Sequence, residues 1–191
     1  MPRADLSNHL VHWVKGASDE DAFAVLSKIA SEGRLLGSNG FIKGEFNCVC
    51  FTEAPQNTFH NVIGKYRPFG VQVSKRWLFS QGGRPVIYQP LADYDSLPES
   101  HNWRHVTYDL DHKPQPVDFS WEREWRIKTD ELLLPPEARI LVPHQAWAEA
   151  LQEQHSESEE YRIQMEALAY GEEWLMQDPE PFHYAYSVIN V

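Results

Sequence analysis

The stretch 119–127 limits most strongly what this chain can fold into, because bulky apolar and polar side chains alternate along it. Read with the period of two that a strand imposes, one face carries Phe119, Trp121, Trp125 and Ile127. The other face carries Ser120, Glu122, Glu124 and Arg126. An amphipathic helix also fits, since the two tryptophans stand four residues apart. The aromatic and β-branched flanks and the nearby prolines favour a strand over 121–127 with both tryptophans buried.

As a strand, this stretch places the carboxylates of Glu122 and Glu124 roughly 6–7 Å apart on one side. One carboxylate of such a pair stabilises a developing positive charge, while the other positions or deprotonates an acceptor. The alternative is a solvated face without chemistry, in which Glu122 pairs with Arg126. The sequence therefore offers two candidate catalytic carboxylates on a strand that we expect to border a cleft.

Composition and charge indicate one mixed domain with an acidic end. A chain of 191 residues can bury a sizeable core, and 7 Trp and 8 Tyr suit a domain that contains a cleft. Of the net charge of −11, residues 145–191 contribute ten acids against Arg162 alone. We therefore expect a core over 1–144 and an acidic helical appendage over 145–191, packed on the same domain. This acidity argues against broad non-specific binding to nucleic acid, but the core still suits an anionic ligand.

Nothing in the sequence indicates export or membrane insertion. No apolar run is long enough for a membrane span, and residues 1–5 do not begin a signal peptide. Cys48 and Cys50 stand too close in one predicted strand for an easy disulfide. We therefore expect a cytoplasmic protein with reduced cysteines and no membrane partner.

Short strands dominate the predicted elements, and the fold class is α+β. A helix is expected after an N-terminal cap at Ser18, and Gly33 ends it. A helical turn is expected over 75–79, loops over 35–44 and 91–102, and two acidic helices over roughly 145–154 and 158–175. Further strands are expected at 10–14, 48–52, 68–73, 85–88, 103–110 and 139–142, with a strand-like end at 182–189.

Several common catalytic motifs are missing from the sequence. The phosphate-binding glycine motifs and the serine nucleophile elbow do not occur. His9 and His12 lack a nearby third ligand, so no metal site is expected. Cys50 with a distant histidine would make a thiol enzyme, although a Cys-Val-Cys strand is more often buried core.

Five short motifs occur in an order that resembles a known family. They are Leu10-Val11-His12-Trp13, Cys48-Val49-Cys50-Phe51-Thr52-Glu53-Ala54-Pro55, Tyr66-x-Pro68-Phe69-Gly70-Val71, Gly82-Gly83-x-Pro85-Val86-Ile87-Tyr88 and Trp121-x-x-Glu124-Trp125-Arg126. Over about residues 9–143 the chain resembles the phage-resistance AbiGi family and the related DUF2971 proteins, within the ADP-ribosyltransferase-like fold. The resemblance implies a split mixed sheet around a cleft that takes NAD as a substrate. It also implies a toxin or phage-defence effector that modifies a macromolecular acceptor.

The resemblance implies a role for each matching residue near the reacting ribose of NAD. His12 would bind the nicotinamide-side ribose or the carboxamide, and Thr52 would lie beside that ribose. Glu124 would hold the ribose 2′-hydroxyl and stabilise the oxocarbenium-like centre as nicotinamide leaves. Glu122 would orient or deprotonate the acceptor. The choice of Glu124 over Glu122 as the catalytic carboxylate depends on register, and the Trp121-x-x-Glu124 pattern favours it.

Further residues are expected to bind the rest of NAD. Tyr66 or Phe69 would stack on nicotinamide, and the pyrophosphate would meet a guanidinium of Arg67, Arg84 or Arg126. The middle strand departs from the family pattern, since it carries Phe51-Thr52-Glu53 in place of Ser-Thr-Ser. A carboxylate at Glu53 would disfavour a diphosphate close by.

A second class of function stays open at this stage. The chain would then be a non-catalytic module of the same fold that binds a nucleotide or a partner, such as a sensor or an antitoxin-like subunit. The acidic segment after residue 144 suits a basic protein partner or an antitoxin, a lid, or exclusion of nucleic acid from the cleft. Its bland alternative is a solvated helical face.

Overall fold

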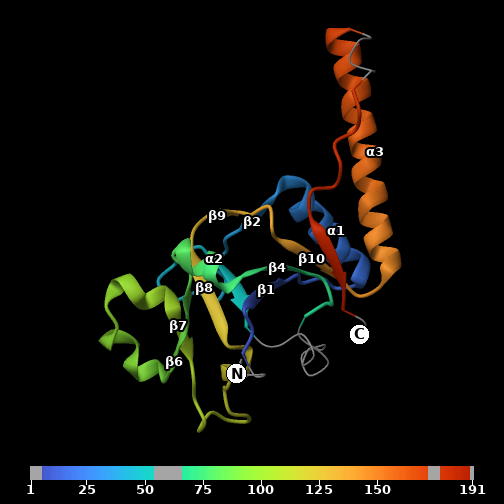
Figure 1. Ribbon diagram of the computed structural model, residues 1–191. Coiled ribbons are helices and arrows are strands. Elements are labelled where there is room, and N and C mark those ends of the chain that lie inside the picture. The colour runs from blue at the N-terminus through green and yellow to red at the C-terminus, as the bar shows by residue number, and fades with distance from the viewer. Residues whose placement is uncertain (1–5, 54–65, 172–176, 190–191) are drawn as a thin grey trace.

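The computed structural model describes residues 6–53, 66–171 and 177–189, and a seven-stranded mixed sheet runs through its centre (Figure 1). The strand order is β11-β10-β4-β1-β3-β8-β5, and all neighbours are antiparallel except β10 and β11. The strands are β1 (His9–Trp13), β3 (Cys48–Thr52), β4 (Gly70–Ser74), β5 (Arg84–Pro85), β8 (Glu124–Lys128), β10 (Arg139–Val142) and β11 (Ala185–Val188). The predicted α+β class is confirmed.

Two small sheets flank the main one. In the first, β2 (Arg34–Leu36) pairs with β9 (Glu131–Leu133). In the second, β6 (Ile87–Gln89) runs parallel to β7 (His105–Thr107). The strand predicted at 85–88 is therefore divided between two sheets, and the one predicted at 103–110 is shorter. The expected loop over 91–102 contains two 3₁₀ helices, η2 (Leu91–Ser96) and η3 (Glu99–Arg104).

Local sequence signals account for the first helix, α1 (Asp19–Glu32). Ser18 and Asp21 form the predicted capping box, and Gly33 ends the helix with φ of 63°, where a residue with a Cβ would be strained. The face made by Ala22, Phe23, Leu26 and Ala30 is buried in the main core against the sheet. The short helix α2 (Lys75–Ser80) also forms where it is predicted.

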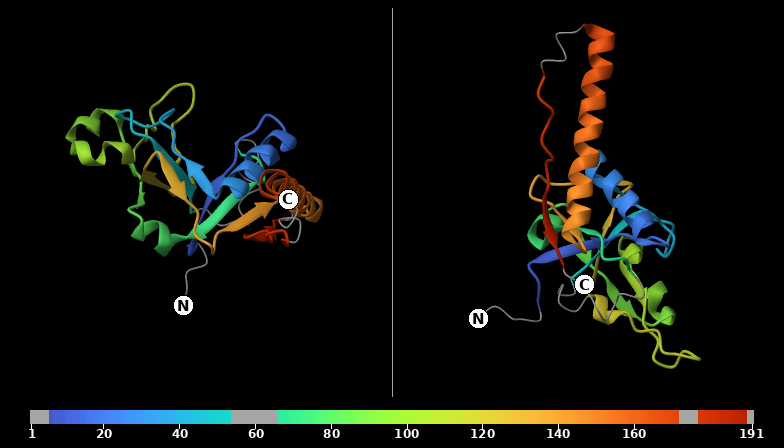
Figure 2. Two further views of the ribbon diagram at one scale, coloured as in Figure 1. Left: turned by 90° about the horizontal axis from the view of Figure 1, so that it is seen from above. Right: turned by 90° about the vertical axis from the view of Figure 1, so that its right-hand side faces the viewer.

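The acidic segment forms one helix, α3 (Gln145–Tyr170), and not the two that were predicted. The sequence over 155–157 contains no Gly or Pro, so nothing there interrupts the backbone hydrogen bonds. Ala148 and Leu151 pack in the main core, while the outer half projects beyond the sheet with the returning chain beside it (Figures 1 and 2). His155 Nε2 donates to the carbonyl of Glu180 on that returning chain at 2.8 Å. No helix among the described residues has both the length and the apolar character needed to cross a membrane.

The stretch 119–127 is only partly a strand. Its first part forms the 3₁₀ turn η4 (Ser120–Glu122), and β8 begins only at Glu124. Asp118 Oδ1 accepts from the backbone N–H of Ser120 at 2.9 Å, which favours a turn over an extended chain. Arg123 then adopts a left-handed conformation with φ of 47°. The prediction that Trp121 is buried is wrong, since it is 44% exposed, whereas Trp125 packs against the core.

The main sheet opens between β1 and β3. β1 pairs with β4 through all five of its residues, from His9 to Trp13. It pairs with β3 at one position, where Val11 lies opposite Thr52. The two halves of the sheet therefore separate along the rest of β3, and this opening positions the site described below.

Candidate functional site

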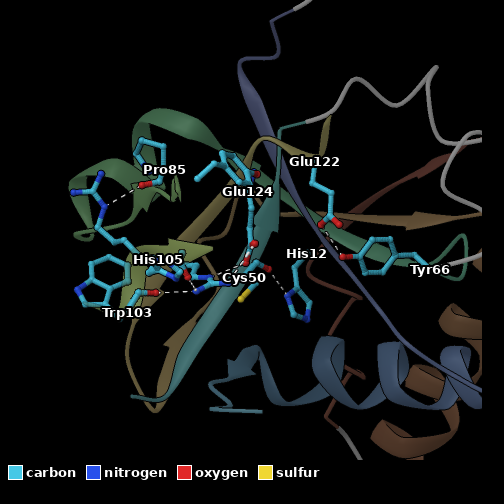
Figure 3. Close-up of polar contacts among 11 residues, drawn as sticks. His12, Cys50, Tyr66, Pro85, Trp103, His105, Glu122 and Glu124 are labelled. Atoms are coloured by element: carbon cyan, nitrogen blue, oxygen red, sulfur yellow. Dashed lines mark hydrogen bonds and ion pairs between the residues drawn. The ribbon is translucent and has the colours of Figure 1, made fainter. Parts of the chain in front are cut away.

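A cleft of about 890 Å³ lies at the opening of the sheet, within the usual size range of small-molecule sites. Strands β1, β3, β7 and β8 border it, together with the loop that carries residues 38–43. Six of the residues predicted from the sequence line it, and they are His12, Thr52, Tyr66, Glu122, Glu124 and Arg126. Figure 3 labels four of these side chains around the opening, His12, Tyr66, Glu122 and Glu124.

His12 lies where the strands part. Its Nδ1 donates to the backbone carbonyl of Cys50 at 2.8 Å, so a side chain satisfies this carbonyl of β3. The imidazole ring also contacts the ring of Phe51 edge to face, with centroids 5.8 Å apart. Burial lowers the pKa of His12, and the charge of Lys15 lowers it further, against the opposing hydrogen bond. The ring is therefore neutral at pH 7, and because Nδ1 carries the proton, Nε2 is an acceptor.

Glu124 is held by Arg126 on the same strand. Arg126 Nε donates to Oε1 at 2.7 Å and Nη2 donates to Oε2 at 3.3 Å. Arg126 is 4% exposed, and its Nη1 donates to the carbonyls of Trp103 and His105. Burial works to lower the pKa of Arg126, but the Glu124 carboxylate more than offsets this and raises it. This network fixes the position of the Glu124 carboxylate before any ligand arrives.

Glu122 reaches the cleft by a different route from the one predicted. It lies in the turn η4 and not on β8, and it is 4% exposed. The Tyr66 hydroxyl donates to Glu122 Oε2 at 3.0 Å, and Thr52 Oγ1 donates to the backbone carbonyl of Glu122. Burial and then the charge of Glu122 raise the pKa of Tyr66, so its hydroxyl stays protonated and donates. The residues around the sheet opening therefore hold this second carboxylate as well.

The thiol of Cys50 lies between these groups on the cleft floor. Cys50 is opposite Arg126, and Thr52 is opposite Glu124, so these four side chains share one face of the β3–β8 pair. Burial, followed by the charge of Glu124, raises the pKa of Cys50 to about 12. The thiolate is the nucleophilic form, so this environment argues against a Cys50-dependent enzyme.

Three of the residues offered as alternatives for binding NAD lie outside the cleft lining, whereas Tyr66 and Arg126, the other members of those sets, line it. Phe69 is fully buried in the core and contacts Phe23 and Trp147. Arg67 bonds the loop before α1, including Asp19 at 3.2 Å. Arg84 donates to the carbonyls of Phe79 and Gly83 and lies 4.1 Å from the Phe79 ring centroid.

The carboxylate of Glu53 does not line the cleft. It pairs with Lys75 at 2.5 Å and accepts from the indole nitrogen of Trp125 at 3.0 Å. It follows Thr52 in the chain, and the alternation of an extended segment sends the two side chains to opposite sides. Thr52 therefore lines the cleft and Glu53 does not.

Sequence reasoning missed the residues at the other end of the cleft. Lys15, Phe41 and Lys43 line it there, and the last two stand on the loop that was predicted over 35–44 without a functional role. The signal available in the sequence was an aromatic residue and a lysine, Phe41 and Lys43, enclosed between Gly40 and Gly44. His105 also borders this part of the cleft, and among the described residues neither of its ring nitrogens has a hydrogen-bond partner of normal geometry.

Together, the fold and the cleft define an α+β protein with two positioned carboxylates, a neutral histidine and a threonine at a split in its sheet. Among the described residues, no group of three His, Cys, Asp or Glu side chains is arranged to hold a metal ion. No family model matches this chain, and comparisons with curated proteins and with solved structures also found no match. The geometry of the cleft therefore carries the functional argument.

Proposed function

We propose that this protein is an NAD-dependent ADP-ribosyltransferase of the ADP-ribosyltransferase-like fold, and that the cleft is its active site. One observation carries the proposal. His12, Thr52, Glu122 and Glu124 come from three separate parts of the chain and line one cleft where the main sheet opens. The resemblance to the AbiGi and DUF2971 families supports the same activity, in a toxin or phage-defence effector that acts on a macromolecule.

In the proposed reaction, Glu124 acts on the ribose next to nicotinamide. The bond between ribose C1′ and the nicotinamide nitrogen breaks, and its electron pair leaves with nicotinamide. The carboxylate of Glu124 stabilises the positive charge that develops on the ribose. Arg126 holds this carboxylate in place, so little reorganisation is needed when the charge appears.

His12 and Glu122 serve the two ends of the same reaction. The neutral His12 accepts a hydrogen bond at Nε2 from a ribose hydroxyl or from the carboxamide N–H of nicotinamide. The nucleophilic atom of the acceptor forms a new bond to C1′, and its proton passes to the carboxylate of Glu122. Tyr66 and the backbone bond from Thr52 hold Glu122 in position for this step.

A second candidate is a non-catalytic module that binds a nucleotide or a partner in the same cleft. The observation that favours it is the ion pair of Glu124 with Arg126, which partly neutralises the carboxylate. A carboxylate whose charge is matched in the resting protein offers less stabilisation to a developing cation.

One experiment separates these two candidates. Nicotinamide release from NAD is measured with the purified full chain, with and without cell extract as a source of acceptor, while calorimetry measures ADP-ribose binding. Release above the uncatalysed rate supports the transferase. Binding of ADP-ribose without release in any extract supports the module, and the absence of both binding and release overturns both proposals.

A further inference from the structure

The two ends of the cleft carry opposite charge. Glu124 lies opposite Thr52 at one end of β3, and Ser38, at the start of the 38–43 loop, is bridged to Cys48 at the other end. Cys48 and Thr52 are four residue steps apart along the strand, which corresponds to about 13 Å. The cleft therefore runs along β3 from a carboxylate end to the loop.

Two lysines line the loop end. Lys15 follows β1, which runs antiparallel to β3 with Val11 opposite Thr52, so Lys15 lies toward Cys48. Lys43 lies on the loop, close enough to His105 that its charge contributes to lowering the pKa of that buried ring, after the larger effect of burial. Each ammonium is near an aromatic ring, at 5.7 Å from the centroid of Phe41 for Lys15 and at 6.0 Å from that of Tyr94 for Lys43. Within 6–53, 66–171 and 177–189, neither lysine forms a salt bridge with a carboxylate.

An aromatic ring stands at the same end. Phe41 lines the cleft and is nevertheless 89% exposed. Its neighbour Gly40 has open space where a Cβ would lie, so the chain beside the ring is not packed against other groups. A flat apolar face with a cation beside it is suited to stacking on a nucleic base.

The arginines expected to bind pyrophosphate are not available at this end. Arg67 and Arg84 lie outside the lining, and Arg126 binds Glu124 and two carbonyls. Lys15 and Lys43 are thus the cations of the described lining that no carboxylate neutralises. An anionic group that enters the cleft is attracted to the loop end and repelled from the carboxylate end.

We infer that Lys15 and Lys43 bind the pyrophosphate of NAD and that Phe41 stacks on its adenine, an inference that rests on the proposed function. The charges of the cleft then set the direction in which the dinucleotide lies. The cationic nicotinamide of NAD points to Glu122 and Glu124, and the anionic pyrophosphate lies at the loop.

The test measures binding alone, so it does not depend on turnover. Calorimetric titrations of the full chain with ADP-ribose compare wild type with Lys15→Gln, Lys43→Gln and the double variant. Each single change is expected to weaken ADP-ribose about tenfold, because each removes one charge-assisted contact, and the double change about a hundredfold. Lys28→Gln is the matched control, since Lys28 is exposed on α1 and is not among the residues that line the cleft. Its affinity should equal that of wild type.

The stacking role of Phe41 has its own control. Phe41→Ala is expected to weaken ADP-ribose about tenfold, which corresponds to the loss of one base–aromatic contact, while Leu133→Ala on β9 leaves it unchanged. Ribose 5-phosphate, which lacks adenine, should bind wild type and Phe41→Ala equally. Equal binding of ADP-ribose by wild type and Phe41→Ala would overturn the stacking role.

The outcomes for the inference and for the proposed function are distinguishable. Unchanged ADP-ribose affinity in the double lysine variant, while wild type still releases nicotinamide, overturns the inference and leaves the function standing. Lysine-dependent binding of ADP-ribose without nicotinamide release overturns the transferase and leaves the inference standing. If wild type binds neither NAD nor ADP-ribose, both are overturned.

Discussion

Arg126 binds both carboxylate oxygens of Glu124, at 2.7 and 3.3 Å, from a position two residues further along the same strand. The guanidinium has almost no access to solvent, and its remaining nitrogen donates to the carbonyls of Trp103 and of His105, the first residue of β7. This single side chain therefore links the candidate catalytic carboxylate to the wall of the cleft. Both the stability of the protein and the geometry of Glu124 depend on it.

Replacing Arg126 tests this link. Arg126→Met leaves the Glu124 carboxylate half-buried without its cation, and we expect the free energy of unfolding to fall by about 3–5 kcal/mol. Urea denaturation followed by fluorescence of the tryptophans measures the change. Arg76→Met, on the exposed surface of α2, is the control and should lie within about 0.5 kcal/mol of wild type.

The double variant identifies the cause of that loss. Glu124→Gln removes the unpaired charge, so Arg126→Met with Glu124→Gln should be more stable than Arg126→Met alone. If the double variant is as unstable as the single one, the loss comes from the carbonyls of Trp103 and His105 and not from the ion pair.

Cys50 gives the protein a pH dependence on the alkaline side. Its pKa is raised from 9.0 to about 12 in the folded state, chiefly by burial, so the folded protein holds this proton more tightly than the unfolded chain. The resulting stability is fully present below pH 9 and is lost as the pH rises toward 12. Cys48, with its pKa raised to about 11 by burial, acts in the same direction.

Two measurements check this prediction for Cys50. The melting temperature of wild type should fall between pH 9 and 12, and Cys50→Ala should fall less steeply over the same range. Iodoacetamide at pH 8 should modify Cys50 far more slowly in the folded protein than in urea, because the thiolate is the reactive form. Rapid modification of the folded protein would contradict the raised pKa.

The projecting helix α3 supplies another prediction, for a basic protein partner or antitoxin. The acids Glu153, Glu157 and Glu160 lie exposed along it. An oligolysine peptide serves as the probe, and its binding should weaken steeply from low to physiological salt, as the Debye length shrinks from about 30 to about 8 Å. Replacing the three acids with Gln should remove most of the binding. Salt-independent binding would leave a solvated helical face as the interpretation of this segment.

Elements with strong local signals could be predicted from the sequence. The capping box at Ser18 and the left-handed Gly33 are set by residues within the helix and its ends, so α1 was predicted at both of its bounds. The short apolar runs of β1 and β3 also identify those strands without tertiary information. These elements carry Thr52 and His12 into the cleft.

Other features depend on contacts that a sequence does not display. Asp118 turns the chain at Ser120, so Glu122 enters the cleft from a 3₁₀ turn and Trp121 stays exposed. Arg67 and Arg84 resemble free cations in the sequence, but backbone carbonyls of residues outside the cleft lining bind both. Only the folded chain shows which charged groups are already paired and which face the cleft.

The position of Glu122 predicts how it affects the reaction. Glu122→Gln keeps the hydrogen bond from Tyr66 but cannot accept the proton of an acceptor, so transfer to a macromolecule should fall by about 10²-fold or more. Hydrolysis of NAD should change less, because water also loses its proton to bulk solvent. The assay compares labelled ADP-ribose on acceptors from cell extract with nicotinamide release in buffer. Equal losses in both reactions would remove Glu122 from the acceptor step.

The last prediction concerns Glu124 itself. Glu124→Gln preserves the size and much of the hydrogen bonding of the side chain but removes the charge that, in the proposed reaction, acts on the developing cation. Loss of such a contact costs about 10²–10³ in rate, because the contact acts mainly in the transition state. Nicotinamide release should therefore fall by that factor, while calorimetry should show nearly unchanged affinity for NAD.

The control for the fixed position of Glu124 is the Arg126→Lys variant, which keeps a positive charge beside the carboxylate. The compact ammonium of lysine cannot bind both oxygens, so the carboxylate should lose its fixed position and kcat should fall while KM changes little. Activity of Glu124→Gln equal to wild type would exclude Glu124 from catalysis and transfer that role to Glu122, the other carboxylate held at the opening of the sheet.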